Sequence, residues 1–384
     1  MRALPEDWEI GGFGIYIHWP YCAAKCPYCD FNSHVASFID HAAWRAAYLE
    51  ELERGFAITG KRVVQSVFFG GGTPSLMEPG TVSAVLDQIS ALWPLANDIE
   101  VTLEANPTSV EASKFAAFRA GGVNRVSMGV QALVDDDLKR LGRLHSAQEA
   151  LAAFDVARGH FDRVSFDLIY GRQDQTLSDW ERELNCALDL AVDHLSLYQL
   201  TVEDGTAFGD RYKAGKLLGL PSDDLGADMY ELTQALCSDR GLPAYEVSNH
   251  AADQAHSKHN LIYWRYGDYL GIGPGAHGRL TRNGSKRATE QTRHPQLWLR
   301  GERDVPHQVL TLEDQGSEFL LMGMRLVSGV DLRRFERLTG NPISPETVSD
   351  LQELGLVDVS GHTISATKSG FAVLNALIAK LLTG

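Results

Sequence analysis

The feature that most constrains the fold is a regular alternation of two kinds of segment in the first half of the chain. Short runs rich in β-branched and aromatic residues are each followed by a stretch with helical hydrophobic spacing. Such alternation is typical of parallel βα units joined by right-handed crossovers. Six units predict an α/β fold of the incomplete TIM-like (β/α)6 kind, with its chemistry at the carboxyl ends of the strands. The predicted strands are 14–19, 63–69, 99–104, 125–130, 163–169 and 194–201.

The loop after the first predicted strand holds three of the five cysteines of the chain, Cys22, Cys26 and Cys29. Thiolates are soft ligands, and this close spacing lets one short loop wrap a soft metal centre. A 4Fe-4S cluster held by only three thiolates keeps one iron open for a small molecule, because such clusters usually take four cysteines. The alternative is a zinc site completed by His18 or His34. The residues favour the cluster.

The segment from Tyr16 to Cys29 has the pattern Y-x-H-x-P-x-C-x3-C-x-Y-C. It resembles the radical S-adenosylmethionine (SAM) superfamily, and within it the group that contains oxygen-independent coproporphyrinogen III oxidase and the heme chaperone HemW. In that superfamily SAM chelates the open iron, and an electron from the cluster cleaves it to a 5'-deoxyadenosyl radical. The resemblance implies a (β/α)6 core with a 4Fe-4S cluster and SAM as cofactors.

Glycines and polar residues close the later predicted strands, where such a barrel places its site. Three glycines after the second strand let the backbone approach a ligand closely, although alone they would also suit a tight turn. A carboxylate inside an apolar run, such as Asp167, is costly unless it is paired or hydrogen-bonded. If these residues bind no ligand, Glu104 is a solvated residue at the rim of the barrel, and Gln131 and Arg143 anchor the helix that follows. The resemblance implies that SAM is bound by Tyr16, Tyr28, Gly71, Gly72, Thr73, Glu104, Gln131, Arg143 and Asp167.

A second motif lies far from the cysteines, where residues 259–264 read HNLIYW. An imidazole can ligate heme iron, and aromatic rings can cover a porphyrin face. The hexapeptide resembles the chaperone branch of the group and implies heme binding by His259, Tyr263 and Trp264. In the alternative interpretation, His259 caps a turn and the two aromatic residues fill the core.

The remainder of the chain predicts a change of architecture. A short strand is expected at 245–248 and a polar linker over 279–314, and two short strands at 356–360 and 362–366 follow several helices. This last part resembles a winged helix without a clustered basic face, so we expect a lid or partner-binding domain. The expected domains are a radical SAM core over 1–204 with its cluster loop at 16–31, an extension and linker over 205–312, and a C-terminal helical, winged-helix-like domain over 313–384.

The composition of the chain limits the classes of partner and the cellular compartment that we expect. A net charge of −15 argues against a nucleic-acid partner, because neutralising phosphates needs a basic surface. The hydrophobic content of 44% suits a soluble globular protein, and no apolar run is long enough to span a bilayer. Cys186 and Cys237 lie in helical patterns and are expected to be small buried side chains. We expect a cytoplasmic protein with reduced thiols, and a homodimer is compatible with the sequence.

Two functions fit these features. The first is a heme chaperone that binds a 4Fe-4S cluster, SAM and heme, and delivers heme to apo-hemoproteins, membrane-associated ones among them. The alternative is an oxygen-independent coproporphyrinogen III oxidase, which performs a radical SAM oxidative decarboxylation. The oxidase usually has a fourth cysteine where Phe31 stands, and a longer arm before the cysteines. These differences and the HNLIYW motif favour the chaperone, so oxidase activity is expected to be absent.

Overall fold

The six predicted strands form the parallel centre of one large sheet in the computed structural model, which describes residues 6–303 and 308–383. Each strand lies beside its successor in the chain, and all five of these pairings are parallel. This arrangement confirms the predicted α/β class with its βα units. The strands are β1 (Phe13–Trp19), β2 (Val64–Gly71), β3 (Leu95–Ala105), β4 (Arg125–Gln131), β5 (Arg163–Tyr170) and β6 (His194–Gln199).

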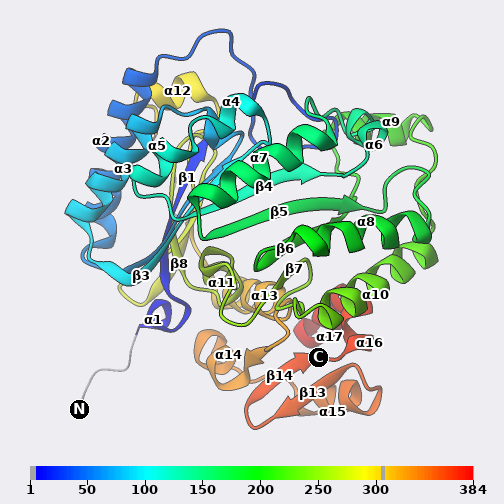
Figure 1. Cartoon of the computed structure of the whole chain (residues 1–384). Coiled ribbons are helices and arrows are strands. Elements are labelled where there is room, and N and C mark those ends of the chain that lie inside the picture. The colour runs from blue at the N-terminus through cyan, green and yellow to red at the C-terminus, as the bar shows by residue number, and fades with distance from the viewer. Residues whose placement is uncertain (1–5, 304–307, 384) are drawn as a thin grey trace.

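Helices between these strands cover one face of the sheet (Figure 1). Nearly every residue of β1, β4 and β5 is buried, whichever face of the sheet it lies on, which explains why the strands read as nearly continuous apolar runs. Two of the helices start with a capping box, at Ser146 and Thr176, which satisfies backbone N–H groups that would otherwise lack partners. The main covering helices are α2 (His41–Thr59), α3 (Pro79–Leu92), α5 (Phe115–Ala120), α7 (Ala147–His160) and α8 (Leu177–Leu190).

Segments from the second half of the chain extend this sheet at both edges. The order is β11-β10-β9-β8-β1-β2-β3-β4-β5-β6-β7, so the sheet remains open between β11 and β7. Among the added strands, β8 lies parallel to β1 and the others are antiparallel to their neighbours. The added strands are β7 (Asn249–Ala251), β8 (Asp268–Ile272), β9 (His277–Arg282), β10 (Ser285–Glu290) and β11 (Gln308–Val309).

Two sequence predictions about this extension are wrong. The short strand is β7 rather than 245–248, and the expected linker forms β9, β10 and α12 (Pro295–Leu299). The linker prediction rested on polar composition, but two of these polar residues, Lys286 and Arg303, are buried. Lys286 and Asp268 are buried in the sheet and lie 3.5 Å apart, and Arg62 pairs with Asp268 at 2.6 Å. Charges paired in this way can lie inside a fold, although in sequence they resemble a solvated segment.

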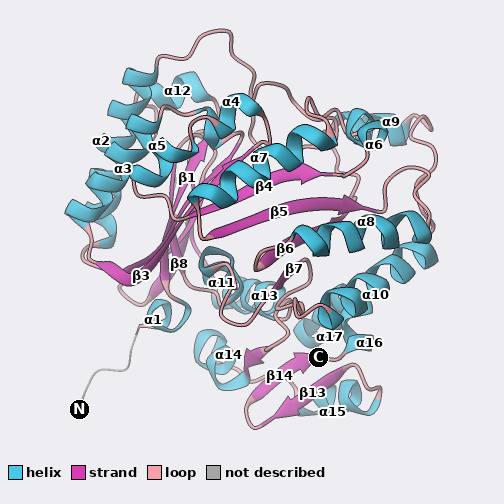
Figure 2. Ribbon diagram, viewed as in Figure 1, coloured by secondary structure: helices cyan, strands magenta, loops and turns pink. Residues whose placement is uncertain are grey.

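The C-terminal part has its own sheet and apolar core (Figure 2). The strand order is β12-β14-β13, which suits the predicted winged-helix-like domain. Its elements are α13 (Leu312–Gly323), β12 (Val330–Asp331), α14 (Leu332–Thr339), α15 (Pro345–Glu353), β13 (Val357–Ser360), β14 (Thr363–Ala366), α16 (Lys368–Ala372) and α17 (Leu374–Thr383). An ion pair between Glu318 and Arg279 joins it to β9 of the large sheet, and one between Arg334 and Asp7 joins it to α1 (Asp7–Gly11).

The remaining helices are short, apart from α10, and connect these parts. They are α1 (Asp7–Gly11), the 3-10 turn η1 (Pro74–Leu76), α4 (Ser109–Ala112), α6 (Asp135–Arg140), α9 (Ala207–Lys213), α10 (Asp223–Asp239) and α11 (Lys258–Trp264). Helix α11 carries the whole HNLIYW motif and contacts β1, β2 and β8. None of the helices in the described part of the chain has both the length and the apolar character needed to cross a membrane.

Candidate cluster and cofactor site

The loop between β1 and α2 carries the three clustered cysteines. Two backbone hydrogen bonds close its base, from the Cys22 N–H to the His34 carbonyl at 2.9 Å and from the His34 N–H to the Pro20 carbonyl at 2.7 Å. All three thiols are free and half-buried, so they lie on one short loop close to the protein surface. This position, directly after a parallel strand, is the one that the barrel rule predicts for a site.

The other two cysteines lie elsewhere and differ from each other. Cys237 is buried, as the sequence predicts, whereas Cys186 is exposed and that prediction is wrong. Cys186 lies on α8, whose apolar face contacts the sheet through Trp180 and Leu184. The spacing of Cys186 from these two residues places it off that face.

Hydrogen-bond donors from neighbouring elements contact the thiol sulfurs. The Thr73 hydroxyl donates to Cys22 Sγ at 3.4 Å, and Arg143 Nη1 donates to Cys26 Sγ at 3.5 Å. Asn106 connects the two donors, because its Nδ2 donates to Thr73 Oγ1 at 2.9 Å and its Oδ1 accepts from Arg143 Nη2 at 2.5 Å. Hydrogen bonds to ligand sulfurs hold and tune iron–sulfur clusters. The network therefore fits a thiolate-bound cluster.

The surroundings of the thiols also affect their protonation. Burial raises the pKa of the Cys22 thiol and of the Cys29 thiol, so the protein environment by itself favours neutral thiols. A bound cation would reverse this preference, because the thiolate is the form that binds metals. Within 6–303 and 308–383, no three His, Cys, Asp or Glu side chains are grouped to hold a single metal ion.

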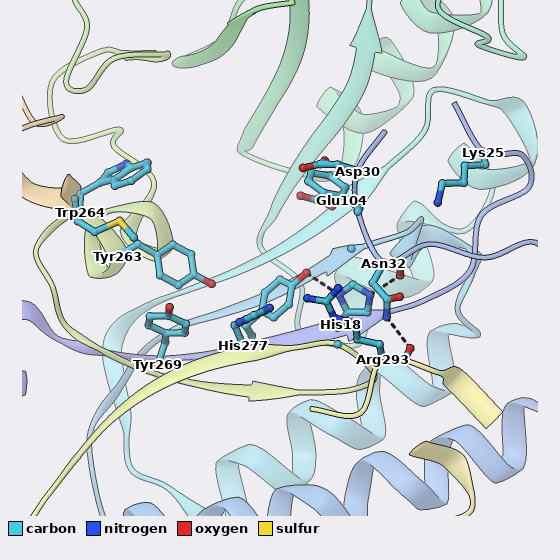
Figure 3. A pocket seen from close by; sticks show the side chains of 15 residues that line it. His18, Lys25, Asp30, Asn32, Glu104, Tyr263, Trp264, Tyr269, His277 and Arg293 are labelled. Atoms are coloured by element: carbon cyan, nitrogen blue, oxygen red, sulfur yellow. Dashed lines mark hydrogen bonds between the residues drawn. The ribbon is translucent and has the colours of Figure 1, made fainter. Parts of the chain in front are cut away.

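A cavity of about 670 Å³ opens beside the cysteine loop (Figure 3). It brings together two groups of residues that are far apart in the sequence. Tyr16, Gly71 and Glu104, predicted to bind SAM, line it together with Tyr263 and Trp264, predicted to bind heme. In Figure 3 the aromatic residues Tyr263, Trp264 and Tyr269 lie at one end and His18, Asn32 and Lys25 at the other. Its volume lies in the range of pockets that bind cofactors.

The glycines after β2 allow close packing against the end of β1. Gly71 has a φ of 104°, and a Cβ there would lie 2.5 Å from the His18 ring. A Cβ on Gly72 would lie 2.6 Å from the Tyr21 carbonyl oxygen, and the Gly72 N–H donates to the Trp19 carbonyl at 2.7 Å. The glycines therefore hold the start of the cysteine loop against β2, in addition to leaving the cavity open at Gly71.

Two predicted carboxylates, Glu104 and Asp167, lie on β3 and β5, the two strands that flank β4. Burial raises the pKa of Glu104 to about 8, and the charge of Asp167 adds to the increase. Burial also raises the pKa of Asp167 to about 6, although hydrogen bonds from Ser196 and Ser127 oppose this shift. A ligand that brings a positive charge into the cavity would favour the ionised form of Glu104. SAM would be such a ligand, because it carries an ammonium group.

Gln131 and Tyr28 flank the network around Arg143 rather than the cavity itself. Gln131 has a φ of 75°, and the register between β4 and β5 shifts at this point. A non-glycine residue with positive φ is uncommon and occurs often at functional sites. Tyr28 packs against Phe208 on α9, and its hydroxyl lies near Cys26 and Arg143. The structure thus places both residues beside the cysteine loop.

His259 lies behind the cavity wall. It is 1% exposed and stacks on Phe68 with ring centroids 4.9 Å apart. Both ring nitrogens have partners, with Nδ1 2.8 Å from Ser66 Oγ and Nε2 2.8 Å from the Tyr263 hydroxyl. Burial lowers the pKa of His259 to about 3, so the ring is neutral. It is not among the residues that line the cavity.

Sequence reasoning missed several residues of the site. Asn106, at the end of β3, was missed because an asparagine before a proline is equally typical of a turn. His277 and Met322 line the cavity but come from β9 and α13. The position of His277 at the start of an added strand could have been found only if β9 had been recognised. Met322 gave no local signal at all.

Known proteins resemble this chain over nearly its whole length. The sequence pattern of the Radical SAM superfamily matches residues 16–187, and that of the HemN C-terminal domain matches 310–373. The chain is 40% identical to the mitochondrial Radical S-adenosyl methionine domain-containing protein 1 of Bos taurus, covering 96% of this chain and 87% of that protein. It is 38% identical to the heme chaperone HemW of Escherichia coli, covering 96% of this chain and 98% of that protein.

Among solved structures, coproporphyrinogen III oxidase (HemN) from Escherichia coli has the same fold. The TM-score is 0.78 over 97% of this chain and 90% of that chain, with 22% sequence identity. The fold is therefore shared with the oxidase, whereas the sequence is closer to the chaperone. On these grounds the chain belongs to the radical SAM superfamily and, within it, to the family of HemW and its relatives.

Proposed function

We propose that this protein is a heme chaperone, which binds a 4Fe-4S cluster, SAM and heme and delivers heme to apo-hemoproteins. The observation that carries the proposal is the shared cavity. Tyr263 and Trp264 of the HNLIYW motif line the same 670 Å³ space as Gly71 and Glu104, beside the cysteine loop. A site for a flat aromatic ligand thus lies against a site for SAM.

Membership of the radical SAM superfamily implies the cluster and SAM. Cys22, Cys26 and Cys29 would each hold one iron, and the bound cluster would supply single electrons to SAM. The protein holds the sulfurs with the Thr73 and Arg143 donors described above. In the proposed site Glu104 would bind the SAM ammonium group, and Tyr16 and Gly71 would line the space for SAM. The residues that would support them are Gly72, Thr73, Gln131, Arg143, Asp167 and Tyr28.

The heme would lie at the aromatic end of the cavity. Tyr263 packs edge-on against Tyr269, with ring centroids 4.4 Å apart, which gives a rigid aromatic wall. Lys25 and Arg293 line the opposite side and can pair with carboxylates such as the heme propionates. His259 hydrogen-bonds Tyr263 and would keep its ring in place.

An oxygen-independent coproporphyrinogen III oxidase is the second candidate, because the HemN structure covers 97% of this chain. That likeness, at 22% identity, concerns the fold alone. Phe31 lines the cavity at the position where the oxidase pattern usually has a cysteine. We therefore expect the oxidase activity to be absent.

The proposal extends to the partners and the compartment. The recipients are apo-hemoproteins, including membrane-associated ones, and a homodimer is the oligomer we would test first. A cytoplasmic location suits the free, half-buried thiols of the cysteine loop, because thiols remain reduced there.

The test is anaerobic reconstitution of the cluster followed by two assays on the same sample. In the first, hemin is added and its Soret absorbance is followed; we expect saturable binding and then transfer to an apo-hemoprotein. In the second, coproporphyrinogen III is supplied with SAM and a reductant; we expect no decarboxylation. Conversion to protoporphyrinogen, or a failure to bind heme, would contradict the chaperone function.

A further inference from the structure

Three histidines lie at or behind the cavity, and two of them have both ring nitrogens hydrogen-bonded. His18 is 5% exposed, with Nδ1 3.1 Å from the Tyr16 hydroxyl and Nε2 2.9 Å from the Asn32 carbonyl oxygen. His259 is bound in the same way by Ser66 and Tyr263. A histidine can bind iron only through a free ring nitrogen, so either ring would first have to give up a buried partner.

His277 differs from both. It begins β9 and lines the cavity with a side chain that is 53% exposed. Its charged neighbour is Glu290, directly across the β9–β10 ladder, whose carboxylate lies 3.9 Å from His277 Nε2. That distance is too long for a hydrogen bond, so the imidazole is not held in the way that His18 and His259 are.

The position of His277 suits a ligand that enters from the aromatic end. Figure 3 shows His277 between the group of Tyr263, Trp264 and Tyr269 and the group of His18 and Asn32. It shares one face of the sheet with Tyr269, because Tyr269 pairs with Arg279 in the ladder and residues two apart on a strand lie on the same face. The imidazole and the aromatic wall therefore border the same space.

We propose that His277 is the axial imidazole ligand of heme iron in this cavity. The proposal rests on the heme-chaperone function proposed above and names the residue that performs it. One ring nitrogen binds the iron and the other turns to Glu290, because histidine ligands of metals usually donate their second N–H to a carboxylate or carbonyl. His259 is then a positioning residue that holds Tyr263.

The test compares variants of the full-length, cluster-reconstituted protein by hemin titration, with absorbance and low-temperature EPR of the heme as readouts. His277→Ala should lose the imidazole-bound spectrum and bind heme roughly tenfold or more weakly. Added imidazole should restore that spectrum. His259→Gln should keep the imidazole-bound spectrum. His362→Ala, which changes an exposed histidine in the C-terminal domain, is the matched control and should behave as wild type.

The outcomes separate the two proposals. If wild type binds heme and His277→Ala keeps its spectrum, the ligand assignment is overturned while the chaperone function stands. The same holds if His259→Gln, and not His277→Ala, loses the imidazole signature. If the wild-type protein binds no heme at all, the chaperone function itself fails.

Discussion

Single side chains around the cysteine loop decide how firmly a cluster could be held. Thr73 and Arg143 donate to two different sulfurs and are joined through Asn106, so neither donor acts alone. Asn106 is in turn oriented by Glu111, whose carboxylate accepts from the Asn106 N–H at 2.8 Å. Replacing such second-layer partners typically lowers metal affinity about 10–100-fold.

Replacing Cys22, Cys26 or Cys29 with Ala should abolish the iron–sulfur absorbance near ~400 nm, because each thiolate holds one iron. Absorbance and iron content after anaerobic reconstitution measure the effect. Cys186→Ala is the control, since Cys186 is exposed on α8, far from the loop in sequence. Loss of the cluster in Cys186→Ala would show that the ligand assignment is wrong.

At the scale of elements, the turn after β2 positions the cysteine loop through close backbone contacts. Gly72→Ala would place a Cβ 2.6 Å from the Tyr21 carbonyl oxygen, and backbone cannot move aside as a flexible side chain can. We expect lower iron content and a loss of about 1–3 kcal/mol in the free energy of unfolding, typical of overpacking. Chemical denaturation and iron analysis measure both.

Gly80→Ala is the matched control for this variant. Gly80 lies in α3, and a Cβ there would meet nothing within 4 Å. Because alanine is favoured over glycine within helices, this change should leave iron content unchanged and raise stability by up to about 1 kcal/mol. Equal loss of iron in both variants would remove the packing explanation for Gly72.

Helix α14 joins the C-terminal domain to the large sheet through one buried arginine. Arg334 forms two 2.7 Å hydrogen bonds with the Asp7 carboxylate and also donates to the Arg265 carbonyl at 2.6 Å. Arg334→Met leaves these acceptors without their donor, so we expect a loss of about 3–5 kcal/mol in the free energy of unfolding. Arg333→Met, its exposed neighbour, should have little effect. Comparable losses in both would contradict this role.

The docking of this domain matters for the site as well. Met322, on α13 of the C-terminal part, lines the cavity together with residues from β1 and the cysteine loop. A weaker attachment in Arg334→Met should therefore lower heme affinity without changing cluster content, which hemin titration of the same variant would measure.

At the scale of the whole molecule, several buried histidines are neutral in the folded state. Burial lowers the pKa of His18, His145 and His250 to about 4 and of His259 to about 3. The unfolded chain binds protons at these rings below about pH 6.5, whereas the folded chain does not. Unfolding therefore takes up protons between about pH 6.5 and 4, and stability falls as the pH falls through that window.

His250→Phe tests this account, because His250 lies on β7, away from the cysteine loop. Each such histidine contributes a slope of up to about 1.4 kcal/mol per pH unit, so the variant should show a flatter decline in stability below pH 6.5. Urea denaturation at several pH values measures it. The raised pKa values of Glu104 and Asp167 act in the opposite direction but are common to both proteins. An unchanged slope would contradict the burial of a neutral His250.

Much of the core follows from local patterns alone. Each of the six strands overlaps its predicted range, because strands buried on both faces must be apolar runs bounded by turn residues. Strand β2 runs two residues beyond its predicted end at Phe69, to Gly71, which has a positive φ. The cysteine loop could also be predicted from the sequence, because the spacing of ligands within one short loop is a local property.

The contacts that make a site were decided only by the tertiary structure. Sequence patterns cannot show that the HNLIYW segment lies against β1 and β2, or that the polar stretch after Arg279 completes the sheet. They also cannot show that both nitrogens of His259 are already used, while His277 has a ring open to the cavity. The sequence determines periodicity and ligand spacing, which are local. Which side chains share a cavity depends on pairings between strands distant in the chain, and these emerge only when the whole sheet is assembled.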